Sequence, residues 1–249
     1  MKPTILFLFN SSDYAPAPWI ADGRFNVVSI DYDDTDHSGT TRATAGNHIH
    51  LNIDLSLPDS HAAVMRHLDA LGLGPIGFIW SFAPCTSLAV SGAGWFKSKA
   101  LVDPDFQKKA IAMARIVEAF DCPAIVENPV SVLATEWFKP VYVQPYQFGY
   151  LLGYDDTHPQ FPDVIPARDN YSKKTGLWCV GGAVAPIGDT TAVRPAGDSP
   201  LHTKLGGKSA RTKYIRSLTP RGLALGVYHT NVAIALRSVG RYSYGSLAH

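Results

Sequence analysis

The sequence predicts an α/β fold in which a mostly parallel sheet is flanked by helices. Apolar runs of strand length alternate with stretches of helical periodicity through the first half of the chain. Strands that alternate with helices form right-handed βαβ units, and such units build a parallel sheet. The 249 residues are 46% hydrophobic and 17% charged, which suffices for one large domain with a buried core.

The predicted strands are short apolar runs, most of them bounded by polar residues, Gly or Pro. They are, in chain order, Thr4–Phe9, Asn26–Ile30, Leu51–Leu55, Gly77–Ser81, Ala124–Val126 and Thr175–Val180. Two later segments, Gln144–Arg168 and Gly181–Lys208, are rich in Gly and Pro and predict irregular structure. The pattern is therefore Rossmann-like, with a small irregular C-terminal region.

Three stretches predict helices, namely Ser60–Leu71, Asp105–Phe120 and Thr219–Arg237. The second has a clear apolar face with a period of 3.6 residues, and Asp103 or Pro104 lies near its start. These helices are expected to separate the strands and to cover the sheet.

Charge is distributed unevenly along the chain. Residues 1–164 carry 10 Lys and Arg against 18 Asp and Glu, a balance of −8, whereas residues 165–249 carry 12 against 3, a balance of +9. A basic C-terminal third predicts contact with an anionic partner such as nucleic acid. The residues expected to contact phosphate are Lys204, Lys208, Arg211, Lys213 and Arg216. A solvated surface is the alternative interpretation.

The cysteines and the hydropathy indicate a reduced protein in the cytoplasm. Cys85, Cys122 and Cys179 are too few and too scattered for a disulfide framework or a zinc site. No apolar run has the length of a membrane span, and Met1 leads directly into the first strand. We expect no membrane partner. Cys122 and Cys179 resemble small core residues.

Chemically capable side chains directly follow three predicted strands. Asp31 follows the second strand, Pro84-Cys85 follows the fourth, and Glu127-Asn128 follows the fifth. Because ligands bind beyond the carboxyl ends of parallel strands, these residues are expected to meet at one edge of the sheet. A loop cysteine beside a carboxylate can act as a nucleophile, although a structural cysteine is the alternative for an isolated Pro-Cys pair.

Five segments together resemble the C5-cytosine DNA methyltransferases, in the order in which that family has its motifs. They are Phe82-Ala83-Pro84-Cys85-Thr86, Val126-Glu127-Asn128-Pro129, Lys173-Lys174-Thr175-Gly176-Leu177-Trp178, Arg216-Ser217-Leu218-Thr219-Pro220-Arg221 and His229-Thr230-Asn231-Val232. The Pro-Cys and Glu-Asn segments match closely and the others more loosely. The chain is most similar to the short, divergent members found in bacteriophages.

The resemblance implies a class I methyltransferase fold and methyl transfer to C5 of cytosine in DNA. Cys85 is then the nucleophile that adds to C6, Glu127 is the acid at N3, and Asn128 orients the loop. The base must leave the helical stack to reach such a site. The residues expected to contact substrate are Pro84, Thr86, Lys173, Lys174, Thr175, Lys208, Arg211, Lys213 and Arg216.

The resemblance also implies S-adenosylmethionine as the methyl donor. The residues expected to bind it are Phe9, Asn10, Ser11, Ser12, Asp31, Asp54 and Asn231, with Asp33 as an alternative to Asp31 at the ribose hydroxyls. The family opens with a Phe-x-Gly-x-Gly turn, but this sequence has Phe9-Asn10-Ser11-Ser12-Asp13, without glycine. That departure leaves the identity of the donor open.

Two other functions and a domain division follow from the same comparison. One alternative is a related C5-pyrimidine enzyme that acts on a free nucleotide or transfers another one-carbon group, and the other is a non-catalytic nucleic-acid-binding relative. Residues 1–180 are expected to form the catalytic domain, 181–214 a reduced recognition insert and 215–249 a segment that returns to the catalytic domain. Because this insert is small, sequence specificity should be short or relaxed.

The histidines and Trp19 are given no catalytic role by the sequence. We expect His48 and His50 to point to opposite faces of a strand or to cap it, and therefore expect no metal. Trp19 is equally consistent with a cofactor cover and with a core residue.

Overall fold

The computed structural model describes residues 1–34, 42–43, 46–207 and 209–245. Its centre is an eight-stranded sheet with the order β3-β4-β2-β1-β5-β6-β8-β7. The strands are β1 (Thr4–Leu8), β2 (Asn26–Asp31), β3 (Arg42–Ala43), β4 (His48–Asn52), β5 (Ile76–Ser81), β6 (Ala124–Pro129), β7 (Val141–Val143) and β8 (Thr175–Val180). The run from β4 to β6 is parallel, whereas β3 and β8 are antiparallel to their neighbours. The predicted Rossmann-like α/β fold is confirmed.

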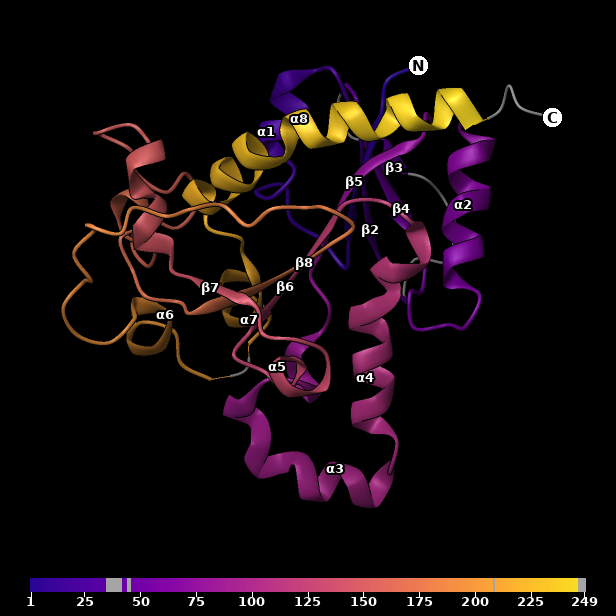
Figure 1. Ribbon diagram of the computed structural model, residues 1–249. Coiled ribbons are helices and arrows are strands. Elements are labelled where there is room, and N and C mark those ends of the chain that lie inside the picture. The colour runs from indigo at the N-terminus through magenta and orange to yellow at the C-terminus, as the bar shows by residue number, and fades with distance from the viewer. Residues whose placement is uncertain (35–41, 44–45, 208, 246–249) are drawn as a thin grey trace.

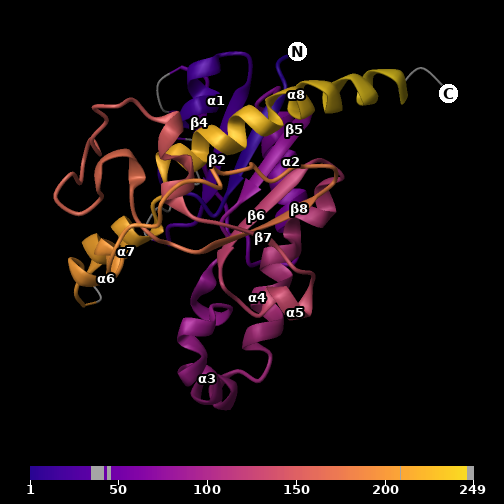
Figure 2. The same cartoon turned by 60° about the vertical axis from the view of Figure 1, so that its left-hand side comes forward.

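Helices cover both faces of the sheet (Figures 1 and 2). The α-helices are α1 (Ala17–Asp22), α2 (Ser60–Ala70), α3 (Phe96–Val102), α4 (Phe106–Ala114), α5 (Leu133–Glu136), α6 (Pro200–Thr203), α7 (Ala210–Ser217) and α8 (Arg221–Gly245). The 3-10 helices are η1 (Cys85–Ser87), η2 (Val90–Trp95), η3 (Arg115–Phe120), η4 (Pro145–Leu151) and η5 (Ala167–Asp169).

Alternating side chains of the strands divide the core into two layers. Leu6 and Leu8 of β1 face a cluster that contains residues of α2 and α4, while Ile5 and Phe7 face a cluster with residues of α1 and α8. Helix α8 lies directly on β5, because a Cβ atom at Gly77 would come within 2.7 Å of the Ala235 carbonyl oxygen. Both faces are thus buried, as expected for a parallel sheet.

A third, smaller cluster lies outside these two layers. It contains Val164, Ile165, Tyr171, Leu201, Leu205, Ile215 and Leu218. These residues come from the loops around η5 and from α6, α7 and the residues that follow each helix; α6 and α7 lie together at the lower left of Figure 2. The part of the chain around α6 and α7 therefore has a small core of its own.

The predicted strand at Leu51–Leu55 is wrong in position, since β4 covers His48–Asn52 instead. Ile53 and Leu55 are buried because they pack in the core cluster that includes α2 residues, not because they pair in the sheet. The segment predicted as one helix over 105–120 is divided into α4 and η3. The last predicted helix begins two residues later than expected and extends to Gly245.

Candidate active site

The loop after β5 presents Cys85 at the carboxyl edge of the sheet. The Phe82 amide donates to the Leu8 carbonyl (2.9 Å), so the loop leaves β5 beside the end of β1. Pro84 has an extended backbone and Cys85 opens η1. The Cys85 carbonyl accepts from the amides of Leu88 (3.0 Å) and Ala89 (2.8 Å), which closes a tight turn. Cys85 is exposed.

Asn128 fixes this loop from the neighbouring strand. Its side chain is buried, and its Nδ2 donates to the Ala83 carbonyl at 2.8 Å, two residues before Cys85. The segment after β6 adds backbone bonds, because the Val132 amide donates to Leu88 and the Val90 amide donates to Val130, both at 3.0 Å. The expected orienting contact of Asn128 is therefore present in the geometry.

Glu127 lies one residue before Asn128 on β6, beside the start of β8. In the antiparallel register Glu127 pairs with Leu177, so Thr175 lies diagonally across from it on the same face. Burial raises the pKa of the Glu127 carboxyl, while the Lys173 ammonium and a hydrogen bond from Thr175 favour its charged form. The side chain is suited to hold a proton to a higher pH than an exposed glutamate.

Cys85, Glu127 and Lys173 influence one another electrostatically. Although Cys85 as a residue is exposed, its surroundings desolvate the thiol and raise its pKa, and the negative charge of Glu127 raises it further. The ammonium groups of Lys173 and Lys99 oppose this shift. Lys99 also donates to the Thr86 carbonyl, next to Cys85. A thiol, an acid and two cations therefore converge at the loop.

Lys173 should control the reactivity of Cys85. We expect Lys173→Met to raise the pKa of the Cys85 thiol, because a stabilising positive charge is lost. Alkylation of Cys85 by iodoacetamide near neutral pH should then slow several-fold. Peptide mass spectrometry measures alkylation at each cysteine separately. Cys122 and Cys179 should react slowly, because burial raises the pKa of Cys122 to about 12 and that of Cys179 to about 11.

Lys174→Met is the matched control, because the Lys174 ammonium lies 4.4 Å from the centre of the Tyr142 ring and is not among the charges that shift Cys85. Equal alkylation rates in wild type and both variants would contradict the electrostatic coupling of Lys173 to Cys85.

The glycine-free turn after β1 is stabilised by its own side chains. Phe9 has a φ of 56°, in the left-handed region that favours glycine. Asn10 and Ser12 are buried, and Asn10 Nδ2 donates to the Ser12 carbonyl (2.7 Å) and to Ser29 Oγ (3.2 Å). Their side chains are thus directed into the protein rather than away from it.

Asp31 meets this turn at the end of β2. Burial raises the pKa of the Asp31 carboxyl, and a hydrogen bond with the Ser11 side chain opposes the shift. The structure therefore brings Asp31 and Ser11 together, as the predicted donor site requires, whereas the alternative Asp33 is exposed.

Two other residues predicted to bind the donor make local contacts. Asp54 Oδ1 accepts from the Ser56 amide (2.9 Å) and hydroxyl (2.6 Å), in a turn after β4. Asn231 is buried on α8 and exchanges two hydrogen bonds with the backbone of Val184, at 3.0 and 2.8 Å. These contacts give Asn231 a structural function in anchoring the chain after β8 to α8.

Several of the predicted phosphate and substrate contacts are engaged within the protein. Arg216 donates to the carbonyls of Leu201 (3.1 Å) and Leu205 (2.7 Å), and so connects α7 to α6. Arg211 lies 3.5 Å from the Asp163 carboxylate, Lys204 donates to the Asp163 carbonyl, and Lys173 donates to the Leu218 carbonyl. Lys213 is exposed, and Lys208 lies outside the described residues.

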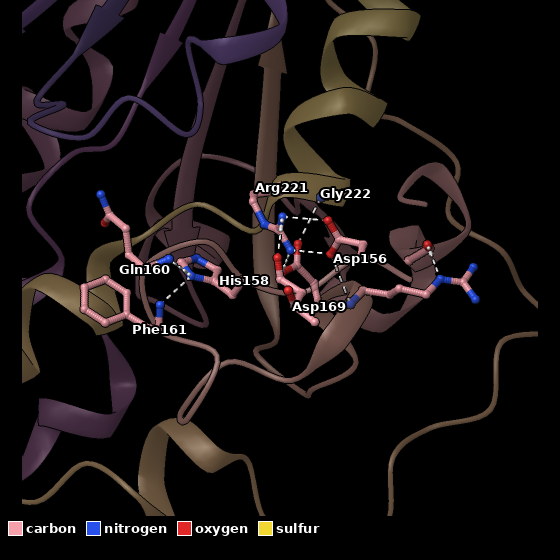
Figure 3. Close-up of polar contacts among 10 residues, drawn as sticks. Asp156, His158, Gln160, Phe161, Asp169, Arg221 and Gly222 are labelled. Atoms are coloured by element: carbon pink, nitrogen blue, oxygen red, sulfur yellow. Dashed lines mark hydrogen bonds and ion pairs between the residues drawn. The ribbon is translucent and has the colours of Figure 1, made fainter. Parts of the chain in front are cut away.

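Arg221 is the centre of an ionic network that the sequence reasoning missed. It makes a bidentate pair with Asp156, and its guanidinium lies 3.9 Å from Asp169 (Figure 3). Asp169 also accepts from the Gly222 amide at the start of α8 (3.0 Å). The network joins η5 to the N-terminus of α8. In the sequence, the network was indicated only by Arg221, the last residue of the segment Arg216-Ser217-Leu218-Thr219-Pro220-Arg221.

The expectation that His48 and His50 point to opposite faces of the strand is wrong. Residues two apart on a strand share a face, and the two ring centroids lie 4.4 Å apart. Asp13 Oδ1 lies 3.7 Å from His48 Nδ1 and 3.5 Å from His50 Nε2. Trp19 is fully buried and stacks on Phe78, which identifies it as a core residue.

Comparison of the sequence with models of protein families finds no match, and comparison with curated proteins finds none either. In the described part of the chain, no helix combines the length and the apolar character that crossing a bilayer requires.

Proposed function

We propose that this protein transfers a methyl group from S-adenosylmethionine to C5 of cytosine in DNA, through a covalent adduct with Cys85. The observation that carries the proposal is the convergence of Cys85 and Glu127 at the carboxyl ends of β5 and β6. The buried Asn128 holds the Cys85 loop at this position. A thiol and an acid of raised pKa are the groups that addition to a cytosine ring needs.

The chemistry assigns each residue a separate task. The Cys85 thiolate adds to C6, and the electron pair displaced from the C5–C6 bond makes C5 nucleophilic. Protonated Glu127 donates at N3 and offsets the negative charge that develops on the ring. After methyl transfer, loss of the C5 proton to a base expels the Cys85 thiolate and restores the ring. S-adenosylmethionine, when bound, supplies the methyl group.

The turn after β1 and Asp31 are the residues that would hold the donor. Asn10 and Ser12 are buried, so their side chains do not occupy the solvent-facing side of the turn, where the donor would bind. The left-handed φ of Phe9 gives this turn a conformation usual for glycine. The Asp31 carboxylate can accept from ribose hydroxyls at the position where dinucleotide-binding folds have an acid.

Binding of the donor tests this assignment. Calorimetry should detect S-adenosylmethionine or its demethylated product bound to the wild type, and Asp31→Ala should weaken that affinity by about tenfold or more, since one or two hydrogen bonds to a charged group are lost. Asp69→Ala is the matched control, because Asp69 is exposed on α2. Lack of binding to the folded wild type would remove S-adenosylmethionine from the proposal.

Contact with DNA should depend on cations of the C-terminal third. In the variant with Lys208, Arg211 and Lys213 all replaced by Ala, we expect the slope of log affinity against log salt to flatten. Each phosphate contact contributes about 0.9 to that slope. Arg211 should contribute less than the lysines, because Asp163 already lies near its guanidinium. Sequence preference should change little, since phosphate contacts position and base contacts specify.

The control for this salt titration replaces Arg66 and Lys109, which are exposed on α2 and α4. If the slopes of wild type and of both variants coincide, the charge asymmetry has no connection with DNA.

A free nucleotide is the second candidate substrate, and two observations favour it. Ser11 and Asp13 stand where the family has glycines, and several C-terminal cations, among them Lys173 and Arg216, are engaged with backbone carbonyls of this chain. Such an enzyme would bind DNA weakly with little salt dependence, and its turnover of nucleotide would not change in the triple variant.

A further inference from the structure

Three side chains with metal-binding atoms meet beside the turn after β1. Asp13 comes from that turn, and His48 and His50 come from β4. Each offers one ligand atom, and these atoms all lie within 4.8 Å of one another. Ile49, between the two histidines, packs against the core cluster on the side of the sheet covered by α2 and α4. Because side chains alternate along a strand, His48 and His50 face the opposite side of the sheet.

Two of the three spacings between these atoms are close to those of ligands around a tetrahedral ion, and the two histidine nitrogens lie within 4.8 Å of each other. Bonds of about 2.0–2.2 Å place neighbouring ligand atoms roughly 3.3–3.6 Å apart. Asp13 Oδ1 lies 3.5 Å from His50 Nε2 and 3.7 Å from His48 Nδ1. Shifts of a few tenths of an ångström therefore bring the Asp13 pairs to bonding geometry.

A second layer of contacts orients His48 for this function. Its Nε2 lies 3.0 Å from Ser29 Oγ, and Ser29 Oγ itself accepts from Asn10 Nδ2 at 3.2 Å. A histidine whose Nε2–H donates to a neighbouring oxygen has its lone pair on Nδ1, the atom that faces Asp13. Metal-binding histidines commonly have such a partner on the other ring nitrogen.

We propose that Asp13, His48 and His50 bind a divalent transition-metal ion of the zinc class. Two imidazoles and one carboxylate favour Zn²⁺ or Co²⁺ over Mg²⁺ and Ca²⁺, which take oxygen ligands. The side chain of His48 is 3% exposed and that of Asp13 is 73% exposed, so the ion is reached from the Asp13 side. Three protein ligands leave one position for water or another ligand.

The three side chains come from the turn after β1 and from β4, whereas Cys85 and Glu127 come from the loop after β5 and from β6, and the inference does not depend on methyl transfer. A bound ion would connect the turn after β1 to β4, because Asp13 belongs to the turn and both histidines belong to the strand. Binding to the folded state alone would also stabilise the protein. Without an ion, the same three residues can form a network of ordinary hydrogen bonds, and the experiment must distinguish these two states.

Calorimetric titration of tag-free full-length protein with ZnCl₂ is the test. We expect one ion per chain in the wild type and at least tenfold weaker binding in Asp13→Ala and in His50→Ala. These two side chains are the more exposed ligands, so their replacement should preserve the fold even if His48→Ala does not. His202→Ala, in an exposed position of α6, is the matched control and should bind like the wild type.

Two further readouts make the result independent of activity. Co²⁺ should give the intense visible absorption of a tetrahedral complex in the wild type, and this absorption should be lost in Asp13→Ala and His50→Ala. Zn²⁺ should raise the melting temperature of the wild type more than that of either variant. The proposal is overturned if stoichiometric binding is absent in the wild type, if all four proteins bind alike, or if Mg²⁺ competes equally with Zn²⁺.

Discussion

Replacement of Cys85 by alanine should abolish methyl transfer while leaving the fold intact. We expect the rate to fall by at least about 10⁴-fold, because Cys85 is the group that forms the bond to C6 in the proposed reaction. The melting temperature should change little, since Cys85 is exposed and contributes little packing. Methylation assays and thermal unfolding of the same preparations measure both effects. Cys179→Ala is the control for loss of a thiol elsewhere in the chain.

Cys85 should also form a trapped adduct with substrate that contains 5-fluorocytosine. Fluorine at C5 prevents the proton loss that releases the enzyme, so the bond from sulfur to C6 persists. Denaturing electrophoresis and peptide mass spectrometry should find this adduct on Cys85 in the wild type and in Cys179→Ala. An adduct that forms equally well with Cys85→Ala would show that another residue is the nucleophile.

Replacement of Glu127 by glutamine should have the next largest effect. We expect the rate to fall by about 10²- to 10⁴-fold, the usual contribution of a general acid. Glutamine preserves the size and can still donate a hydrogen bond to N3, but it has no ionisable proton to transfer to the ring. Glu136→Gln is a matched control, because Glu136 lies on α5 rather than on β6. A loss of less than about threefold in Glu127→Gln would contradict the assigned role.

The pH dependence gives a sharper test of the same residue. The active form needs the Cys85 thiolate and protonated Glu127, so the rate falls at low pH as the thiolate is lost and at high pH as the acid is lost. Burial raises the pKa of Glu127 and extends its protonated range upward. In Glu127→Gln there is no acid to lose, and the rate should rise with pH to a plateau. A retained fall at high pH would contradict this account.

Removing Glu127 should at the same time make Cys85 more acidic. The carboxylate raises the pKa of the thiol, so Glu127→Gln should lower it and accelerate alkylation of Cys85 near neutral pH. Lys173→Met should have the opposite effect. The opposite signs of the two variants distinguish electrostatic coupling from a general change in access to the thiol.

The fold was predictable from the sequence because its strands are apolar runs separated by periodic helices. The exception at β4 has a physical cause. His48 and His50 are polar but pair with β2, whereas Ile53 and Leu55 are apolar but pack outside the sheet. The hydrophobicity of a residue predicts whether it is buried, but not whether it pairs in a sheet. At β4 the apolar residues that are buried and the residues that pair with β2 are partly different.

The convergence of Cys85 and Glu127 was also predictable, since Cys85 lies on the loop after β5 and Glu127 lies in the carboxyl-terminal half of the adjacent parallel strand β6. The influence of Lys173 on these two groups was not, because it depends on the antiparallel register of β6 and β8. The engagement of Arg216 with the Leu201 and Leu205 carbonyls depends in the same way on how α6 and α7 pack. Long-range packing of this kind leaves no periodic signal in a single sequence.

Mass spectrometry of nucleosides from the DNA of a producing host tests the central claim most directly. The host strain must lack cytosine methylation of its own, and cells producing wild type are compared with cells producing Cys85→Ala. Our account predicts 5-methyl-2′-deoxycytidine in DNA from the wild-type cells and none in DNA from the Cys85→Ala cells. Unmodified cytosine in the DNA of both strains, with both proteins folded and abundant, would contradict it.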